Sequence, residues 1–391
     1  MIQYPALVVV KCFAGMEELL AEEINSICQK ECKILKRAVE FSASKEDIYR
    51  VNYLSRFGIK VLVEFTRFPC GDEQSLYDQV KAIEWEKFLS LQDTFSINAV
   101  LINSKLDHTK YAALKCKDAI ADRFRDKYGE RPNVNTIDPD LKIHLHVSNN
   151  QAILSFDSSG EPLFKRGYRQ ETGPAPLNEI VAAAIIKWTG WNGEVPLIDI
   201  TCGSGTLLTE AARMALNRPS QEKRKKFGFF SWRDFDPKLF TQIRQEADQS
   251  IANTEIKLIG VDISQRVLEA AKENASSANV DHCIRFIFKD FNEFEPKEEA
   301  GVIVANPPYG ERLTSENIRR FYNDLGSWLK HNAVNFSAYI LSMDHDESKQ
   351  IGLKPKWQKQ VFNGSIPCKL RAYELYSGSK KKMDQTIEGG S

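Results

Sequence analysis

The chain has 391 residues, which at about 150 residues per domain is enough for two or three domains. Its 42% hydrophobic and 27% charged residues are typical of a folded globular protein and exclude fibrous and disordered classes. Lys plus Arg and Asp plus Glu both number 53, so no overall charge attracts the chain to nucleic acid or to an anionic membrane, and a polyanion would have to bind at a local patch.

Residues 1–160 alternate between strand and helix patterns. Apolar alternation and helical spacing predict, in chain order, a strand at 6–13, a helix at 16–29, a strand at 33–42, a helix from Ser44 to Arg56, a strand at 59–67, a helix at 75–89, a strand at 94–102, a helix at 110–128, and strands at 141–147 and 151–157. This part is expected to fold as one α+β unit, or as two fused ones, with mixed sheets.

A segment rich in glycine, proline and charge at 160–176 indicates a linker or a seam between domains. The pattern after it predicts a helix at 177–188, a strand at 195–200, a helix at 206–216, a strand at 256–261, a helix at 265–275, and strands at 284–289 and 300–305. Strands that alternate with helices in this way predict a parallel, doubly wound sheet, whose ligands gather at the carboxyl ends of the strands.

Membrane and metal binding are not expected. No stretch approaches the roughly 20 consecutive apolar residues that span a bilayer, and the first residues lack the pattern of a signal peptide, so we expect a cytoplasmic protein. Eight cysteines without a C-x-x-C pair are expected to stay reduced. Cys28 with Cys32, and His144 with His146, have no further metal ligands near them in the sequence.

The most informative local segment is PLIDITCGSGTLLTEAA at 196–212. It combines a strand that ends in Asp199, a tight turn with Gly203 and Gly205, and a helix that opens at Thr206. Such a turn brings backbone N–H groups close to a nucleotide-like ligand. The segment departs from the dinucleotide pattern G-x-G-x-x-G, because the third glycine position is Leu208.

Two further strands are followed by acids. Asp262 comes after the strand at 256–261, where a carboxylate can accept hydrogen bonds from both hydroxyls of a ribose. Asp290 and Phe291 follow the strand at 284–289, where the acid could bind an adenine and the ring could cover it. Three carboxylates at successive strand ends after a glycine turn predict a site for a cofactor that contains adenosine.

The fourth strand leads into Asn306-Pro307-Pro308-Tyr309. The prolines fix the backbone, so that the side-chain oxygen of Asn306 and the carbonyl of Pro307 can both accept hydrogen bonds from one NH₂ group. A conjugated amine is a poor nucleophile because its lone pair is spread into the ring. Two acceptors localise that lone pair and orient it, while Tyr309 stacks on the flat group that carries the amine.

In this chain order, Asp199 with CGSGT, Asp262, Asp290 and NPPY resemble the S-adenosylmethionine-dependent methyltransferases that act on exocyclic amines or amides. The resemblance narrows further. The segments at 108–132, 155–169 and 175–185 are similar to those of the bacterial THUMP-domain large-subunit (23S) ribosomal RNA guanine-(2-amino) methyltransferases, and the similarity extends to about residue 380. Two positions depart from the usual family pattern, Ile200 and Phe164, and neither removes a polar group that the transfer needs.

The resemblance implies an α/β architecture in which a Rossmann-like methyltransferase domain follows ferredoxin-like and THUMP parts. The implied boundaries are a ferredoxin-like part at 1–44, a THUMP RNA-binding domain at 45–158, the methyltransferase domain at 159–382 and a flexible tail at 383–391. The implied activity is methylation of the 2-amino group of a guanosine in ribosomal RNA of the large subunit or in its assembly precursor.

The resemblance also assigns the site residues. The methionine end of S-adenosyl-L-methionine would be held at Asp199 and the glycine turn, its ribose at Asp262 and its adenine at Asp290. The implied cofactor-binding residues are Asp199, Cys202, Gly203, Ser204, Gly205, Thr206, Asp262, Ile263, Asp290, Phe291 and Asn306, and the implied catalytic residues are Asn306, Pro307, Pro308 and Tyr309.

Candidate RNA contacts lie in two basic stretches. The first, a possible phosphate-binding patch or else an ordinary solvated loop, comprises Arg213, Arg218, Lys223, Arg224, Lys225 and Lys226. The second is the helix at 110–128, whose cations alternate with acids as on an ordinary solvated face. Arg166 and Arg169, in the seam, could serve either neighbouring domain.

Three alternatives remain open. The NPPY motif also suits a 6-amino methyltransferase of adenine in RNA or DNA, and a methyltransferase of glutamine amides in protein. The DNA alternative predicts a target-recognition insertion, and the sequence shows none of that size. From another class, a non-catalytic RNA-binding ribosome assembly factor could retain the fold, although the intact strand-end motifs argue against lost activity.

Overall fold

A computed structural model describes residues 2–170, 176–307, 315–343, 346–364 and 366–377. The chain forms two compact units, of which the first contains Met1–Lys165 and Pro219–Gln249 and the second contains Arg166–Arg218 and Ser250–Ser391. The chain therefore passes from one unit to the other three times. The segment 219–249 lies in sequence between helix and strand of the second unit, but it packs with the first.

The first unit is built on a sheet with the strand order β2-β3-β1-β4-β8-β7-β5-β6. Its neighbouring strands pair antiparallel, except that β5 runs parallel to both β7 and β6. The strands are β1(Ala6–Lys11), β2(Lys33–Leu35), β3(Ala38–Ala43), β4(Lys60–Pro69), β5(Thr94–Ile102), β6(Asn133–Val134), β7(Leu141–Ser148) and β8(Gln151–Asp157). The mixed sheet expected for this part is confirmed.

Helices cover one face of this sheet, where alternate strand residues such as Val8, Val10, Val61 and Val63 are completely buried. The expected N-cap of the second helix is confirmed, because the Ser44 side chain accepts a hydrogen bond from the backbone N–H of Asp47. The helical elements of this unit are α1(Glu17–Cys28), α2(Lys45–Leu54), α3(Glu73–Ala82), η1(Trp85–Lys87), α4(Thr109–Tyr128), η2(Gly228–Ser231) and α7(Pro237–Gln249).

Two expected elements differ. The single strand expected at 33–42 is a hairpin of β2 and β3, whose turn places Arg37 at a φ of +58°. The helix expected at 75–89 ends at Ala82, because Ile83 adopts extended backbone, and a short 3₁₀ turn follows. In both places the apolar pattern continues through the turn, so the pattern alone does not indicate where the strand or helix ends.

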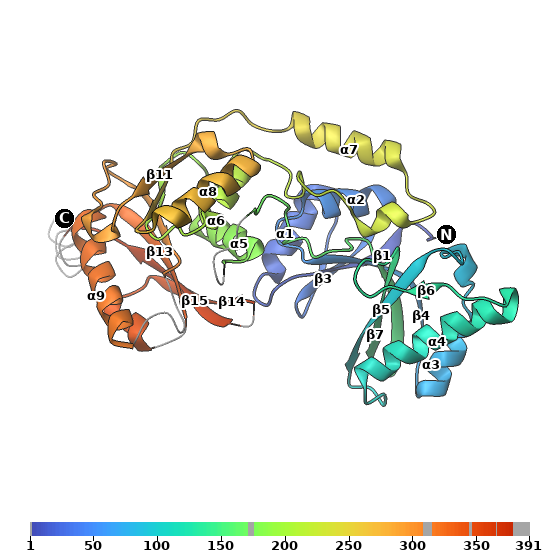
Figure 1. Cartoon of the computed structure of the whole chain (residues 1–391). Helices are drawn as coiled ribbons and strands as arrows, with labels where there is room; N and C mark the ends of the chain where they lie inside the picture. The colour runs from blue at the N-terminus through green and yellow to red at the C-terminus, as the bar shows by residue number, and fades with distance from the viewer. Residues whose placement is uncertain (1, 171–175, 308–314, 344–345, 365, 378–391) are drawn as a thin grey trace, which may run out of the picture. The chain divides into compact units, whose positions relative to one another are not determined.

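Aromatic side chains explain why 219–249 belongs to the first unit. The ring of Tyr49 on α2 stacks on Phe229 with a centroid separation of 4.4 Å, and it makes edge contacts with Phe235 and Phe240. The Tyr49 hydroxyl also accepts a hydrogen bond from the backbone N–H of Asp236 at 3.0 Å. Figure 1 shows α7 running beside α2. Burial of these rings against α2 anchors the segment.

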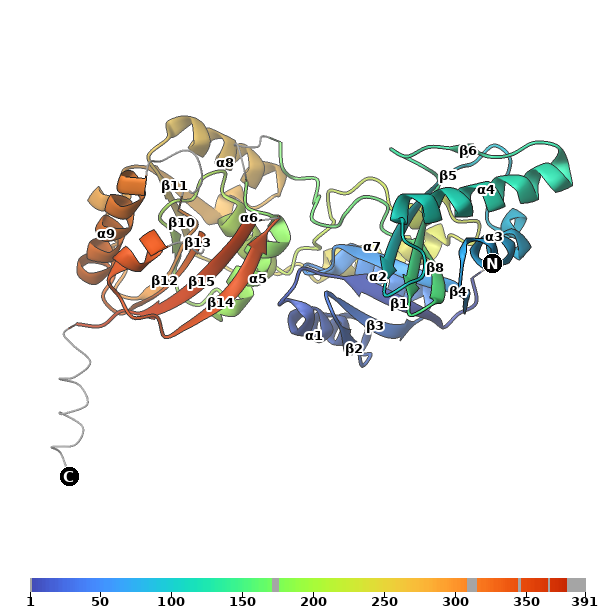
Figure 2. The same ribbon diagram turned by 90° about the horizontal axis from the view of Figure 1, so that it is seen from below.

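The second unit contains a sheet with the order β11-β10-β9-β12-β13-β15-β14. The first five strands are parallel, as expected for a doubly wound sheet, and β15 and β14 add an antiparallel edge that the sequence reading did not include (Figure 2). The strands are β9(Leu197–Asp199), β10(Leu258–Asp262), β11(Ile284–Phe288), β12(Gly301–Ala305), β13(Phe336–Met343), β14(Trp357–Asn363) and β15(Ile366–Glu374).

Helices pack on both faces of this second sheet. On one face, Ile198 and Ile303 belong to a buried cluster with Leu325 and Trp328 of α9. On the other face, Gly260 lies against Leu208 of α6. The helical elements are α5(Glu179–Thr189), α6(Thr206–Ala215), α8(Gln265–Ser277), η3(Asp281–Cys283), η4(Phe291–Glu293), α9(Ser315–Asn332) and η5(Asp346–Ile351).

In the described ranges, no helix of either unit combines the length and the apolar character needed to cross a membrane.

Candidate active site

The carboxyl ends of neighbouring parallel strands bring the predicted polar residues to one edge of the second sheet. Asp199 on β9 is in register with Gly260 on β10 and with Val304 on β12. Asp262 comes two residues after Gly260, and Asn306 comes two residues after Val304. Because parallel strands advance together, Asp262 and Asn306 flank the chain immediately after Asp199.

The glycine turn after β9 has the geometry that needs glycine. Gly203 and Gly205 have φ values of +52° and +78°, where a side chain would be strained. A Cβ added at Gly203 would meet nothing within 4 Å, so the backbone is open to a ligand there. Helix α6 begins directly after this turn at Thr206, and its first backbone N–H groups have no partner within the helix.

Asp262 connects the turn to the next strand. One of its carboxylate oxygens accepts a hydrogen bond from the backbone N–H of Gly203 at 3.0 Å, and the other accepts one from the N–H of Ser264 at 2.9 Å. A carboxylate offers about four acceptor positions, so two remain. They suit a ligand with two adjacent hydroxyls.

Asp199 is the most deeply buried acid of the site, with 1% of its surface exposed. Burial, followed by the nearby charge of Asp262, raises the pKa of Asp199 to about 8, although the backbone N–H of Thr201 donates to it at 3.1 Å. A cationic ligand group beside this carboxyl would favour its charged form. The site therefore contains a buried acid that a cation would stabilise.

Cys202 in the turn and Asp290 at the third strand end each have a defined place in the protein's own structure. The Cys202 side chain is buried, and burial together with Asp199 and Asp262 raises the pKa of its thiol well above the usual range, so it does not act as a nucleophile. The Asp290 carboxylate accepts a hydrogen bond from the backbone N–H of Asn292 at 2.9 Å and caps η4.

The expected cover for an adenine is not supplied by the ring of Phe291. That ring is 8% exposed and packs in the core against Phe321 and Trp328, which corrects the expectation from sequence. Two other apolar side chains at the same strand ends are exposed instead, Ile263 by 68% and Phe288 by 60%. The exposure of Phe288 on an edge strand could not be recognised from the sequence, because the same apolar run also fits a covered strand.

Asn306 follows β12 with an unused acceptor. Its Oδ1 atom is buried and accepts no hydrogen bond from the residues that the structure describes. Pro307 is buried beside it. Pro308 and Tyr309 lie outside the described residues. A buried acceptor without a partner is costly unless a ligand donates to it, so Asn306 is poised to receive a donor.

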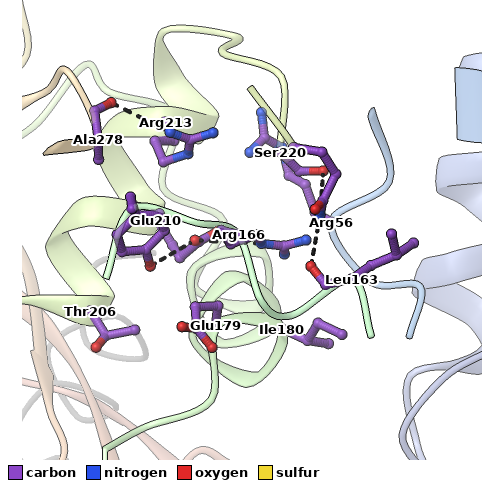
Figure 3. Close-up of polar contacts among 12 residues, drawn as sticks. Arg56, Leu163, Arg166, Glu179, Ile180, Thr206, Glu210, Arg213, Ser220 and Ala278 are labelled. Atoms are coloured by element: carbon purple, nitrogen blue, oxygen red, sulfur yellow. Dashed lines mark hydrogen bonds and ion pairs between the residues drawn. The ribbon is translucent and has the colours of Figure 1, made fainter. Parts of the chain in front are cut away.

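Three cations of the first basic stretch have partners within the protein. Arg213 is completely buried, and its guanidinium donates to the carbonyl of Ala278 at 3.4 Å, as Figure 3 shows. Arg224 donates to the carbonyls of Ser159 and Glu161, and Lys226 pairs with Asp138 at 2.9 Å. These cations hold the protein's own chain, and the stretch is divided between the two units.

Metal binding has no visible basis in the described part of the chain, where no three His, Cys, Asp or Glu side chains gather in a way that could hold an ion.

The segment Arg166–Gln170 supports the glycine turn through hydrogen bonds. Arg169 pairs with Glu179 at 2.8 Å and donates to the Thr206 hydroxyl at 3.3 Å. The backbone N–H of Gln170 donates to Asn274 on α8 at 2.9 Å, and the Asn274 amide in turn donates to the carbonyl of Ser204 at 3.2 Å. The seam segment thus fixes both sides of Gly205, directly at Thr206 and through Asn274 at Ser204.

In the same segment, Arg166 is buried beside Glu210 of α6 with a separation of 3.7 Å (Figure 3). The Tyr168 hydroxyl donates to Glu210 at 3.0 Å. Arg166, one of the two seam arginines expected to reach either neighbouring domain, is therefore a buried residue of the second unit. Asn274 was not among the residues expected to support the site. Its only local signal is an asparagine inside a helix, where this residue is an unfavourable choice.

Replacing Asn274 with alanine is expected to loosen the turn. The variant removes two part-buried hydrogen bonds, one from the Gln170 N–H and one to the Ser204 carbonyl, each of which contributes about 0.5–1.5 kcal/mol. Hydrogen exchange at the Gln170 amide should accelerate accordingly. As a control, Ser277→Ala removes only the exposed bond to the Gln170 side chain and should leave that exchange rate nearly unchanged. Equal exchange in both variants would show that Asn274 does not support the turn.

Comparison with known proteins gives matches along the chain. Residues 8–62 match the family described as RlmL ferredoxin-like domain, residues 70–157 match the THUMP domain, and residues 166–372 match the family described as RMKL-like, methyltransferase domain.

Individual relatives cover most of the chain. A putative RNA methyltransferase, slr0064 of Synechocystis sp., is 35% identical over 364 residues, which are 93% of this chain and 95% of that protein. Ribosomal RNA large subunit methyltransferase K/L of Aliivibrio salmonicida is 36% identical over 381 residues, 96% of this chain and 54% of that protein, so the chain spans about half its length. The solved structure of SMU.472, a putative methyltransferase complexed with SAH, gives a TM-score of 0.85 at 27% identity and covers 97% of this chain and 100% of that one.

Proposed function

The chain belongs to the family of RMKL-like methyltransferases, and we propose that it transfers the methyl group of S-adenosylmethionine to the 2-amino group of a guanosine in large-subunit ribosomal RNA. The architecture expected from the sequence is confirmed, with ferredoxin-like and THUMP domains before a Rossmann-like methyltransferase domain. The observation that carries the proposal is the buried, unpartnered Oδ1 of Asn306 at the same sheet edge as the glycine turn and Asp262.

The residues present fit S-adenosylmethionine. The buried carboxyl of Asp199 suits the cationic amino-acid end, and the two remaining acceptor positions of Asp262 suit the ribose hydroxyls. The open backbone at Gly203 lets a ligand approach the turn. Bound there, the cofactor supplies a methyl group on a positively charged sulfur. SMU.472, at 27% identity, carries the corresponding product SAH.

Asn306 and Pro307 act on the target amine. The Asn306 Oδ1 and the Pro307 carbonyl each accept a hydrogen bond from the NH₂ group, which turns its lone pair out of conjugation and orients it. Neither group has to remove a proton before transfer, because the amine proton becomes acidic only once the nitrogen carries the methyl, and water can accept it. Positioning and hydrogen bonding are therefore the contributions of these residues.

The choice of substrate is supported by two different sources. The relatives are named as RNA or large-subunit ribosomal RNA methyltransferases, and the chain carries a THUMP domain of the kind expected to bind RNA. The assignment of guanine and its 2-amino group rests on the family resemblance of the sequence motifs. The hydrogen-bond acceptors at Asn306 and Pro307 do not decide between the bases, since they also suit the 6-amino group of adenine.

The test is methyl transfer from labelled S-adenosylmethionine to large-subunit ribosomal RNA isolated from cells that lack this protein. Digestion to nucleosides should place the label in 2-methylguanosine. Label in 6-methyladenosine would refute the guanine assignment. Absence of label from RNA and from immature ribosomal particles, with cofactor binding intact, would favour a protein substrate or a non-catalytic assembly role instead.

Replacing Asp262 with alanine is expected to weaken cofactor affinity by roughly 10- to 100-fold, which corresponds to the loss of hydrogen bonds to a charged group. The variant removes the acceptors for the ribose and also the one that holds the Gly203 N–H. Isothermal titration with S-adenosylhomocysteine measures the affinity. Asp281→Ala, which removes an exposed acid after α8, is the matched control and should bind normally. Unchanged affinity in Asp262→Ala would refute the ribose assignment.

A further inference from the structure

A buried arginine lies in the second sheet, close to the strand that leads into the candidate active site. Arg371 on β15 is 8% exposed, and β15 runs beside β13 (Figure 2). Arg371 is the register partner of Ile340 on β13. Ile340 is in turn the register partner of Ala305 on β12, the residue directly before Asn306. Neighbouring strands are about 4.8 Å apart, so roughly 10 Å of sheet separates β15 from β12.

The Arg371 side chain extends toward the carboxyl end of β13. Its Nη1 atom donates to the hydroxyl of Ser342 at 2.5 Å, and Ser342 is completely buried. Two residues before Ser342, Ile340 pairs with Ala305. Continuing this register by two residues places Ser342 level with Pro307. The guanidinium is therefore held at the same level of the sheet as one of the two groups that accept the target amine.

The described part of the chain does not neutralise the charge of Arg371. Among those residues, Ser342 is its one hydrogen-bond partner, and no carboxylate forms an ion pair with it. Tyr322 and Tyr373 beside it are neutral, because burial raises the pKa of each to about 12 against the opposing charge of Arg371. The buried Arg166, by contrast, has a glutamate at 3.7 Å. A buried guanidinium without a carboxylate is costly unless a ligand accepts from it.

Guanine and adenine differ at the position that a further polar group would meet. With the 2-amino group of guanine held at Asn306 and Pro307, the same edge of the ring continues with N1–H and then with the carbonyl oxygen O6. With the 6-amino group of adenine held there, the edge continues with N1 and then with C2–H, which accepts no hydrogen bond. A guanidinium has five N–H donors, and its fork fits O6 together with N7 of guanine.

We propose that Arg371 selects the target base by donating to O6 of guanine, with Ser342 fixing the guanidinium for that contact. The inference rests on the proposed methylation of a guanosine and names the residue that distinguishes this base from adenine. Adenine in the same place would leave buried donors facing a C–H group, which is costly. A phosphate also suits arginine, but Arg371 is separated by a single strand from the strand that leads to the amine acceptors, which favours an atom of the same base.

The first test is single-turnover methyl transfer to large-subunit ribosomal RNA from cells that lack this protein. Arg371→Met replaces the buried charge with an apolar side chain and should lower the rate roughly 10- to 100-fold, as expected for one arginine–guanine contact. Its affinity for S-adenosylhomocysteine, measured by isothermal titration, should stay within about twofold. Lys359→Met, which removes a cation of β14 that lies over the Trp188 ring, is the matched control and should behave like the parent. Parent-like turnover in Arg371→Met, or an equal loss of cofactor affinity, would overturn the proposal.

The second test separates recognition of the base from general support of the site. In an RNA fragment around the labelled nucleotide, the target guanosine is replaced by 2-aminopurine, which keeps the reactive amine and lacks O6. The parent should methylate guanosine roughly 10- to 100-fold faster than the analogue, whereas Arg371→Met should treat the two alike within about threefold. A variant that is slower by the same factor on both RNAs would indicate a phosphate contact or a structural role, and either would refute recognition of O6.

Arg371→Lys covers the case in which the methionine variant does not fold. Lysine keeps the charge but not the fork, so the preference for guanosine over 2-aminopurine should fall below that of the parent. A lysine variant with the full preference of the parent would contradict the proposal. A parent that forms no 2-methylguanosine refutes the proposed function before any variant is compared. A parent that forms it, together with variants that keep its preference, refutes the role of Arg371 alone.

Discussion

Replacing Asn306 with alanine is expected to lower turnover by about 100-fold or more, the size of effect that follows loss of one preorganised hydrogen bond at a reacting group. Its Oδ1 is a buried acceptor without a partner in the described residues, so its removal deprives no donor among those residues of a hydrogen bond. Cofactor affinity should stay within about twofold, because Asp262 and the glycine turn are untouched. The measurement is single-turnover methyl transfer together with isothermal titration of S-adenosylhomocysteine.

The conservative variant distinguishes orientation of the amine from general support of the site. Asn306→Asp keeps a side-chain oxygen in the same place and should recover part of the turnover that alanine loses. Asn332→Ala, which removes a partly buried amide from α9 in the same unit, serves as the matched control and should behave like the parent. A parallel loss of turnover and cofactor affinity in Asn306→Ala would indicate a structural role for Asn306.

The strand-end residues could be predicted because their positions follow from local pattern and one topological rule. A buried strand, a glycine turn and a helix occur consecutively around Asp199, and parallel strands place their carboxyl ends together. Because Asp262 and Asn306 come after strands of the same parallel sheet, they are expected to lie near Asp199. The register of β9 with β10 and β12 agrees with this expectation.

The residues whose positions differ from the expectation are held by contacts between segments that are far apart in the sequence. Arg213 is of a residue type that usually lies on the surface. It is buried, and its guanidinium donates a hydrogen bond to the carbonyl of Ala278, 65 residues later in the chain. Segment 219–249 joins the first unit through rings that meet Tyr49 on α2. Phe291 faces the core because α9 supplies Phe321 and Trp328. Charge and hydrophobicity in a local window carry no information about such partners.

Stability of the protein without cofactor is expected to fall as the pH rises from 4 to 8, because of Asp199. Burial raises the pKa of this carboxyl from 3.8 to about 8 in the folded protein. The folded chain therefore retains a proton that the unfolded chain releases in this interval, and the state that binds more protons loses stability as the pH increases. One pKa unit corresponds to about 1.4 kcal/mol, so the contribution is on the order of a few kcal/mol, fully present below pH 4 and lost as the pH passes 8.

The variant Asp199→Asn should abolish this contribution, because the amide has nearly the same shape and does not ionise. Its stability relative to the parent should increase from pH 4 to pH 8, as measured by urea unfolding at each pH, while its cofactor affinity decreases because a cationic ligand group loses its carboxylate. Asp290→Asn is the control, since that carboxyl is only half-buried and caps η4. A stability difference between Asp199→Asn and the parent that does not change with pH would contradict a buried, proton-retaining Asp199.

In the parent, cofactor binding at pH 7 should release a proton from Asp199, which titration calorimetry in buffers of different ionisation enthalpy detects.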